Sequence, residues 1–116
     1  MKENRKKPRL KTENLLSYEG VDGSGNRAEQ GMGKTLDISH GGLLMETAVP
    51  VEAKFILLMS LDIKEEPIKI KAKVIYSREA EVNLFHTGVR FIETNDRIDA
   101  IIKEMIKDYI SKVISD

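Results

Sequence analysis

Alternating apolar and polar positions predict that most of this 116-residue chain forms β-strands. The alternation is clearest over residues 68–77, where every second side chain is apolar or aromatic: Ile68, Ile70, Ala72, Val74 and Tyr76. A period of two is typical of a strand that buries one face. Less regular apolar runs predict further strands at residues 11–19, 34–39, 42–47, 54–63 and 82–92. We therefore expect six strands.

Glycine, proline and charged residues mark the connections between these strands. Residues 20–33 contain glycines at positions 20, 23, 25, 31 and 33, and are predicted to form one long flexible connection. Pro50 marks a break between two strands, and turns are expected at Glu65-Glu66-Pro67 and at residues 79–81. The other connections are short, which favours antiparallel strands joined as hairpins.

A change of period after residue 93 predicts a C-terminal α-helix over residues 95–114. Apolar residues recur there at steps of three and four: Ile98, Ile101, Ile102, Met105, Ile106, Tyr109, Ile110, Val113 and Ile114. Thr94, Asn95 and Asp96 precede this run and can cap the N-terminus of the helix. The apolar stripe is expected to cover an open end or one flank of the strands, although its breadth also allows a homodimer through the helix.

These elements predict a mainly β fold. Six antiparallel strands with mostly short turns and one terminal helix are typical of a small barrel, because closure removes exposed strand edges. The length suits a single core-forming domain. We expect residues 1–11 to be a flexible N-terminal arm, and residues 12–116 to form the barrel with its C-terminal helix.

Charge is balanced overall but unevenly distributed. The chain has 19 basic and 19 acidic residues, whereas residues 1–11 alone carry six Lys/Arg and one Glu, a net charge of +5. A neutral protein is a poor candidate for binding DNA or RNA, which usually requires a strong positive field. A short cationic arm on a mildly acidic body suits a small anion better, although such arms also serve as solubilising tails.

Composition also bears on location. The chain has no cysteine, which fits a reducing compartment. Its N-terminus is polar and basic without the apolar segment of a secretory signal. The apolar runs are too short to span a membrane, the longest being residues 55–59. We therefore expect a soluble, cytoplasmic protein without a membrane span.

The most distinctive polar motif is Asp37-Ile38-Ser39-His40-Gly41-Gly42, between two predicted strands. Asp37 and Ser39 are two residues apart, so they share one side of an extended strand. Their carboxylate and hydroxyl offer hydrogen-bonding groups, and the glycines allow a sharp turn or a close approach to a ligand. On these residues alone, an ordinary hairpin turn remains open as an alternative.

Two other motifs do not support an enzyme. Gly33-Lys34-Thr35 resembles the end of a phosphate-binding loop, but Ala28 stands where that loop requires its first glycine. Ser39 and His40 are adjacent, so on a strand they face opposite sides and cannot act together as nucleophile and base. We therefore expect a binding protein, with no catalytic residue, metal site or cofactor.

Three motifs taken together resemble the PilZ domain family. They are Arg5-x-x-x-Arg9, Asp37-x-Ser39-x-x-Gly42 and Gly88-Val89-Arg90-Phe91, in this order and spacing. The resemblance extends from residue 4 through the C-terminal helix. It implies a Greek-key β-barrel that binds the bacterial second messenger cyclic di-GMP, and ligand-binding roles for Arg5, Arg9, Asp37, Ser39 and Gly42. It carries no ligand role to Arg90.

The chemistry of these side chains suits that ligand. A guanidinium fork matches the paired acceptors O6 and N7 of guanine, which lysine cannot do. A carboxylate such as Asp37 accepts from the guanine N1 and N2 donors. We expect a stand-alone receptor that signals to a protein partner in motility, adhesion or polysaccharide secretion. The alternative is a barrel of the same family that does not bind nucleotide and serves as a protein-interaction or oligomerisation module.

Overall fold

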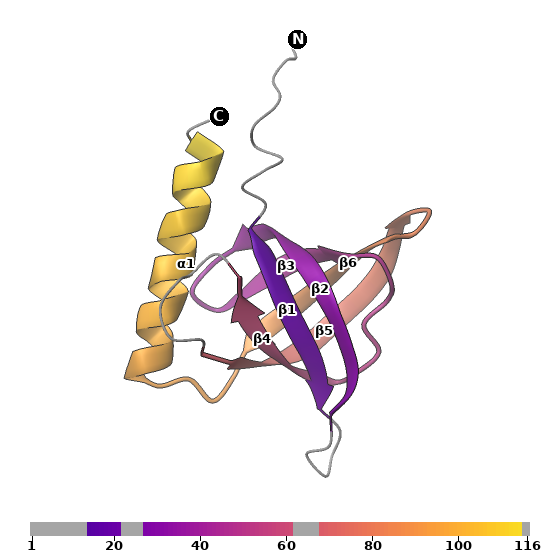
Figure 1. Ribbon diagram of the computed structural model, residues 1–116, viewed down its shortest axis with the longest axis horizontal. Coiled ribbons are helices and arrows are strands. Elements are labelled where there is room, and N and C mark those ends of the chain that lie inside the picture. Colours follow the sequence, from indigo (N-terminus) through magenta and orange to yellow (C-terminus); the bar gives the residue numbers. More distant parts are fainter. Residues whose placement is uncertain (1–13, 22–26, 62–67, 115–116) are drawn as a thin grey trace.

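The computed structural model describes residues 14–21, 27–61 and 68–114, which form strands β1 to β6 and helix α1 (Figure 1). The strands are β1 (Leu15–Val21), β2 (Arg27–Ile38), β3 (Gly42–Thr47), β4 (Phe55–Ser60), β5 (Ile70–Glu81) and β6 (Leu84–Phe91), and the helix is α1 (Asp96–Ile114). Arg5, Arg9 and the expected turn at residues 65–67 lie outside the described residues.

The strands form a closed antiparallel barrel in the order β1-β2-β3-β6-β5-β4. Strands β1, β2 and β3 are sequential neighbours, and β4 returns to pair with β1 through Leu16–Val21 and Phe55–Ser60. This arrangement is a Greek key, because three consecutive strands are joined by a fourth that lies beside the first. The predicted fold, a six-stranded antiparallel Greek-key barrel with a C-terminal helix, is confirmed for the described residues.

Alternation along the strands builds the core. In β1 Leu16 and Tyr18 point inward, and in β3 Leu43 and Met45 do the same, with almost no exposed surface on any of them. The other buried apolar side chains come from the loop after β3, from β4, β5 and β6, and from the helix: Val51, Ile56, Leu58, Ile70, Ala72, Val89, Phe91, Ile102 and Met105. Apolar burial on this scale is the main force that holds such a barrel closed.

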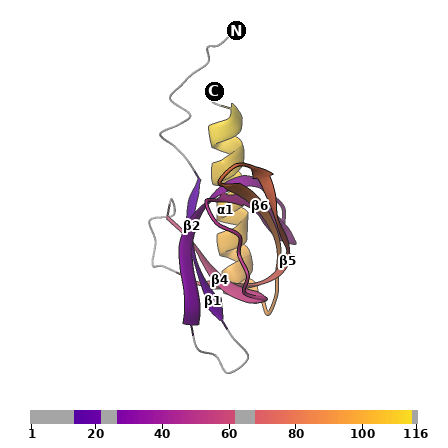
Figure 2. The ribbon, with the colours of Figure 1, turned by 90° about the vertical axis from the view of Figure 1, so that its right-hand side faces the viewer.

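Helix α1 packs on one flank of the barrel. Figure 1 shows it beside the strands, and in the turned view of Figure 2 it lies behind them. Asn95 caps its N-terminus, because the Asn95 side-chain oxygen accepts a hydrogen bond from the Ile98 N–H at 2.9 Å. Ile102 and Met105 are buried, whereas Ile110 and Ile114, near the C-terminal end, are exposed. No helix formed by the described residues has the length and apolar character that a membrane crossing requires.

The prediction of one flexible connection over residues 20–33 is wrong. Strand β1 runs to Val21 and β2 begins at Arg27, so Gly31 and Gly33 lie inside a strand. Neither glycine has room for a side chain: an added Cβ would lie 2.5 Å from the Tyr18 hydroxyl at Gly31 and 2.9 Å from the Met45 sulfur at Gly33. These glycines therefore accommodate large core side chains, instead of providing flexibility.

The turn predicted at residues 79–81 is also wrong. Strand β5 continues to Glu81, and the two-residue turn is formed by Val82 and Asn83. Asn83 has a φ of 63°, in the left-handed region that asparagine tolerates better than most residues. The β5–β6 hairpin consequently extends beyond the rest of the barrel, as Figure 1 shows.

Candidate functional site

A β-bulge near the end of β2 decides which way Asp37 points. Thr35 pairs with Met45 and Asp37 pairs with Leu44, so Leu36 has no partner of its own in β3. Thr35 is buried, and strict alternation would turn Asp37 inward as well. The extra residue reverses the alternation, leaving Asp37 exposed while Ile38 packs against the core. The bulge thus places the carboxylate on the outer face of the barrel.

Local hydrogen bonds fix the turn that follows. The Asp37 carboxylate accepts from the Ile38 N–H at 2.9 Å through Oδ1. The Ser39 N–H donates to the Gly42 carbonyl at 2.9 Å, and the Ser39 hydroxyl oxygen accepts a long bond from the Gly41 N–H at 3.4 Å. The Phe91 N–H donates to the Gly41 carbonyl at 2.9 Å, which ties the turn to β6. The polar groups of the motif are therefore held in place before any ligand arrives.

An open pocket of about 440 Å³ lies where this turn meets β6. Its lining residues come from the β2–β3 hairpin and from β6: Asp37, Ile38, Ser39, Gly41, Gly42, Leu43, Leu44, Val89 and Arg90. The volume falls in the range typical of small-molecule sites. Three predicted site residues, Asp37, Ser39 and Gly42, thus line a single pocket, and Arg5 and Arg9 lie outside the described residues.

The pocket also contains a basic residue to which sequence reasoning gave no role. Arg90 lines the pocket and is exposed on the outer face of β6. Gly42 pairs with Arg90, and Arg90 pairs with Lys73 in β5, so the two cations lie in one row across the sheet. Neither Arg90 nor Lys73 forms an ion pair within the described part of the chain. They therefore give this side of the pocket a positive charge that an anion can use.

An aromatic ring lies in the next row of the same face. Asp37 pairs with Leu44, Leu44 with Gly88, and Gly88 with Tyr76. The ring covers Gly88, because a Cβ added there would lie 2.7 Å from a Tyr76 ring carbon. Tyr76 is 38% exposed, and the Arg78 guanidinium stacks 4.3 Å from its ring centroid. The signal in the sequence that could have indicated this ring is Gly88, because a residue without a side chain leaves room for a ring from the neighbouring strand.

Nothing among the described residues suggests metal binding at this site. No cluster of three or more His, Cys, Asp or Glu residues that could hold a metal ion occurs in the described ranges. His40 is exposed in the turn, and His86 lies in β6, in register with Glu46 of β3. The arrangement around Asp37 is therefore one of hydrogen-bonding and cationic groups on a sheet surface, which is suited to binding an anionic ligand with polar edges.

A barrel of this topology, with a polar hairpin motif beside a pocket on its outer face, defines a small β-barrel domain with a candidate ligand site. The sequence model of the PilZ domain family matches residues 3–111, and the chain therefore belongs to the PilZ domain family. This confirms the resemblance stated from the sequence motifs.

Comparison with solved structures agrees with this assignment of the fold. The chain is similar to a structure described as the PilZ domain with c-di-GMP of YcgR from Escherichia coli, with a TM-score of 0.60. The two are 9% identical in sequence, and the match covers 85% of this chain and 84% of the other. No curated protein shows significant sequence similarity to the chain.

Proposed function

We propose that this protein is a receptor that binds cyclic di-GMP at the pocket between the β2–β3 turn and β6. The observation that carries the proposal is the bulge that brings Asp37 to the outer face beside Ser39 and Arg90. Membership of the PilZ domain family supports it, as does the similarity to a PilZ domain whose structure includes c-di-GMP. Binding, and not catalysis, is the function that these groups serve.

Each side chain has a chemical role in this proposal. Asp37 accepts hydrogen bonds from the guanine N1 and N2 donors, and Ser39 adds a hydroxyl beside it. Arg5 and Arg9 supply guanidinium forks for the guanine O6 and N7 acceptors and for phosphate oxygens. Arg90 and Lys73 lie where they can attract the phosphates. Tyr76 offers a partly exposed aromatic face to a purine ring.

The attachment point of the N-terminal arm supports the participation of Arg5 and Arg9. Asn14 is the first described residue after the arm, and its carbonyl accepts a hydrogen bond from the Thr35 N–H at 2.9 Å. Thr35 lies two residues before Asp37, so the arm joins the barrel close to the site. We propose that residues 1–11 fold over the pocket when ligand bridges them to Asp37 and Ser39. The changed surface would then be read by a protein partner in motility, adhesion or polysaccharide secretion, in the cytoplasm.

One observation favours a second candidate function. Helix α1 exposes Ile110, Val113 and Ile114 to the extents of 48%, 44% and 75% near its C-terminal end. A PilZ-fold interaction or oligomerisation module that does not bind nucleotide would use such a surface, for example in a homodimer. Light scattering with and without cyclic di-GMP separates the candidates, because a constitutive oligomer keeps its mass whether or not nucleotide is added.

Isothermal titration calorimetry with cyclic di-GMP tests the proposed function directly. We expect saturable binding, and much weaker binding of linear guanosine dinucleotide and of GMP, which cannot place two tethered guanines and two phosphates together. The same titration gives the number of ligand molecules per chain. A trace indistinguishable from dilution of cyclic di-GMP into buffer would refute the proposal and leave the interaction module.

A further inference from the structure

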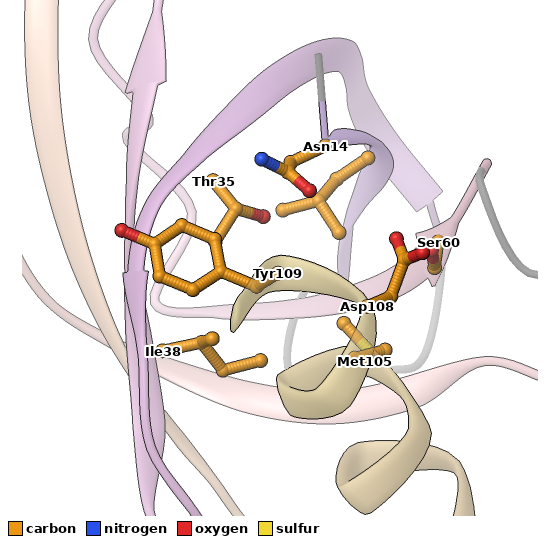
Figure 3. A pocket seen from close by; sticks show the side chains of 8 residues that line it. Asn14, Thr35, Ile38, Ser60, Met105, Asp108 and Tyr109 are labelled. Atoms are coloured by element: carbon orange, nitrogen blue, oxygen red, sulfur yellow. The ribbon is translucent and has the colours of Figure 1, made fainter. Parts of the chain in front are cut away.

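The carbonyl of the bulge residue, Leu36, accepts a hydrogen bond from helix α1. The Tyr109 hydroxyl donates a hydrogen bond of 2.6 Å to the Leu36 carbonyl oxygen. Figure 3 shows the Tyr109 ring lying between Thr35 and Ile38 with its hydroxyl directed toward β2. This contact joins α1 to the residue immediately before Asp37, across 73 positions of sequence.

The contact falls on the one residue of this stretch that has no Cα partner of its own in β3. A bulged residue is unpaired in the sheet, and a backbone carbonyl without a partner is costly where water is excluded. The contact is partly buried, and the gap at this place between helix and barrel is only about 10 Å³, roughly the room for one water molecule. The Tyr109 hydroxyl is therefore the hydrogen-bonding group that stabilises the bulged conformation from the helix side.

The residue before the bulge is also anchored. The Thr35 N–H donates to the Asn14 carbonyl, and Asn14 holds a φ of 54°, in the left-handed region. Thr35 and Leu36 are thus tied by hydrogen bonds to Asn14, the first described residue after the N-terminal arm, and to the C-terminal helix. Any change in the bulge alters the direction of Asp37, because the bulge is what reverses the alternation of β2.

We propose that Tyr109 is a positioning residue for the nucleotide site: it holds the β2 bulge in the register that presents Asp37 to the pocket, and so couples α1 to ligand binding. This inference rests on the proposed function for its ligand. It assigns Tyr109 no contact with the nucleotide. The predicted apolar stripe of α1 included Tyr109 only as a packing residue, so the role of its hydroxyl comes from the geometry.

The free protein provides the first test. In the Tyr109→Phe variant the ring is kept and the hydroxyl is lost, so we expect shifted backbone amide signals for residues 36–39 in ¹⁵N-correlation spectra without nucleotide. Ile102→Val is the matched control, because it removes one methylene from a fully buried position of the same helix. We expect this control to leave residues 36–39 unchanged. Unchanged signals in Tyr109→Phe would overturn the positioning role.

Binding provides the second test. We expect Tyr109→Phe to weaken cyclic di-GMP binding about three- to tenfold, the effect of losing one partly buried hydrogen bond. Ile102→Val should bind as the wild type does. In an Asp37→Asn background, Tyr109→Phe should cause little further loss, because its effect acts through the carboxylate. Full additivity of the two substitutions would contradict that route.

The two proposals fail in different ways. Wild-type protein that binds no cyclic di-GMP would refute the proposed function, and with it the coupling of α1 to the ligand. Wild-type binding with unaltered affinity in Tyr109→Phe would refute only the role of Tyr109. The amide shifts of the free Tyr109→Phe variant report on the bulge independently of either result.

Discussion

Gly42 leaves no room for a side chain beside Val89, because an added Cβ would overlap the Val89 carbonyl oxygen in β6. The neighbouring Arg90 Cα would lie 3.1 Å away. Both obstacles are backbone atoms, which cannot move without disturbing the β3–β6 ladder. The glycine that closes the Asp-x-Ser-x-x-Gly motif is therefore required by the barrel itself, whatever role it has toward a ligand.

Gly42→Ala should consequently lower the free energy of unfolding by about 1–3 kcal/mol, the usual cost of overpacking. Gly41→Ala is the matched control, since a Cβ there meets nothing within 4 Å. Urea denaturation of the two variants checks the prediction. Equal stability of the variants would contradict it. If Gly42→Ala is less stable than Gly41→Ala, a loss of nucleotide binding in Gly42→Ala follows from the damaged barrel and is no evidence of a contact between Gly42 and the ligand.

Replacing either arginine of the N-terminal motif should act on binding and not on stability. We expect Arg5→Ala and Arg9→Ala each to weaken cyclic di-GMP binding at least tenfold, because each would remove the bidentate guanine contact that we propose, a type of contact worth about 1–3 kcal/mol. Arg9→Lys should not restore affinity, since an ammonium group lacks the planar fork. Calorimetry gives the affinities, and thermal unfolding of the free variants should match the wild type. A large fall in melting temperature would mean that the arginines are structural.

Asp37→Asn should reduce affinity while leaving the fold intact. The side chain is exposed, so its charge contributes little to folding. An amide offers one acceptor oxygen where the carboxylate offers two, and Asp37 already uses one of them for the Ile38 N–H. We expect at least a tenfold loss of cyclic di-GMP affinity by calorimetry. Glu104→Gln, an exposed acidic position on α1, is the control for net charge, and an equal loss in that variant would argue against a specific contact.

Stability should depend on pH in the alkaline range through Tyr18. Burial, with a smaller contribution from the Glu29 carboxylate, raises the pKa of the Tyr18 hydroxyl above its ordinary value. The neutral phenol is favoured in the folded state, so this stabilisation is complete below pH about 10 and is lost as the pH rises through the folded-state pKa. Urea unfolding between pH 7 and 11 should show a steeper decline for the wild type than for Tyr18→Phe. Parallel curves would contradict the assignment.

The strands could largely be predicted from the sequence, because burying one face of a strand makes every second residue apolar. The prediction was wrong where a glycine is used for packing: Gly31 and Gly33 read as loop residues, but they admit the Tyr18 ring and the Met45 side chain. A single sequence shows that a glycine is present, but it does not show which neighbouring side chain fills the space where the Cβ would be. The turn at residues 79–81 was misplaced because β5 continues there with both faces exposed, so charged residues stand in the strand and no alternation marks it.

The grouping of residues around the candidate pocket could be predicted in part. Asp37 and Ser39 line one pocket, as their spacing indicated. The reason is not simple alternation, because the bulge at Leu36 is what turns Asp37 outward. A bulge depends on cross-strand register, which is set by pairing with residues distant in sequence. For the same reason the place of Arg90 in the pocket lining and of the Tyr76 ring over Gly88 emerges only when the barrel is closed. The ligand-binding roles of all five predicted residues, Arg5, Arg9, Asp37, Ser39 and Gly42, stay predictions.

The pairing of Gly42 with Arg90 has a consequence for when the pocket exists during folding. The two halves of the pocket are far apart in the sequence, and they come together only when β6 pairs with β3. A chain in which β6 has not paired with β3 therefore lacks this pocket. Nucleotide would bind the completed barrel alone and so would draw the folding equilibrium toward it by mass action. On the proposed function, a higher cyclic di-GMP concentration would thus raise the apparent stability of the barrel as well as its occupancy.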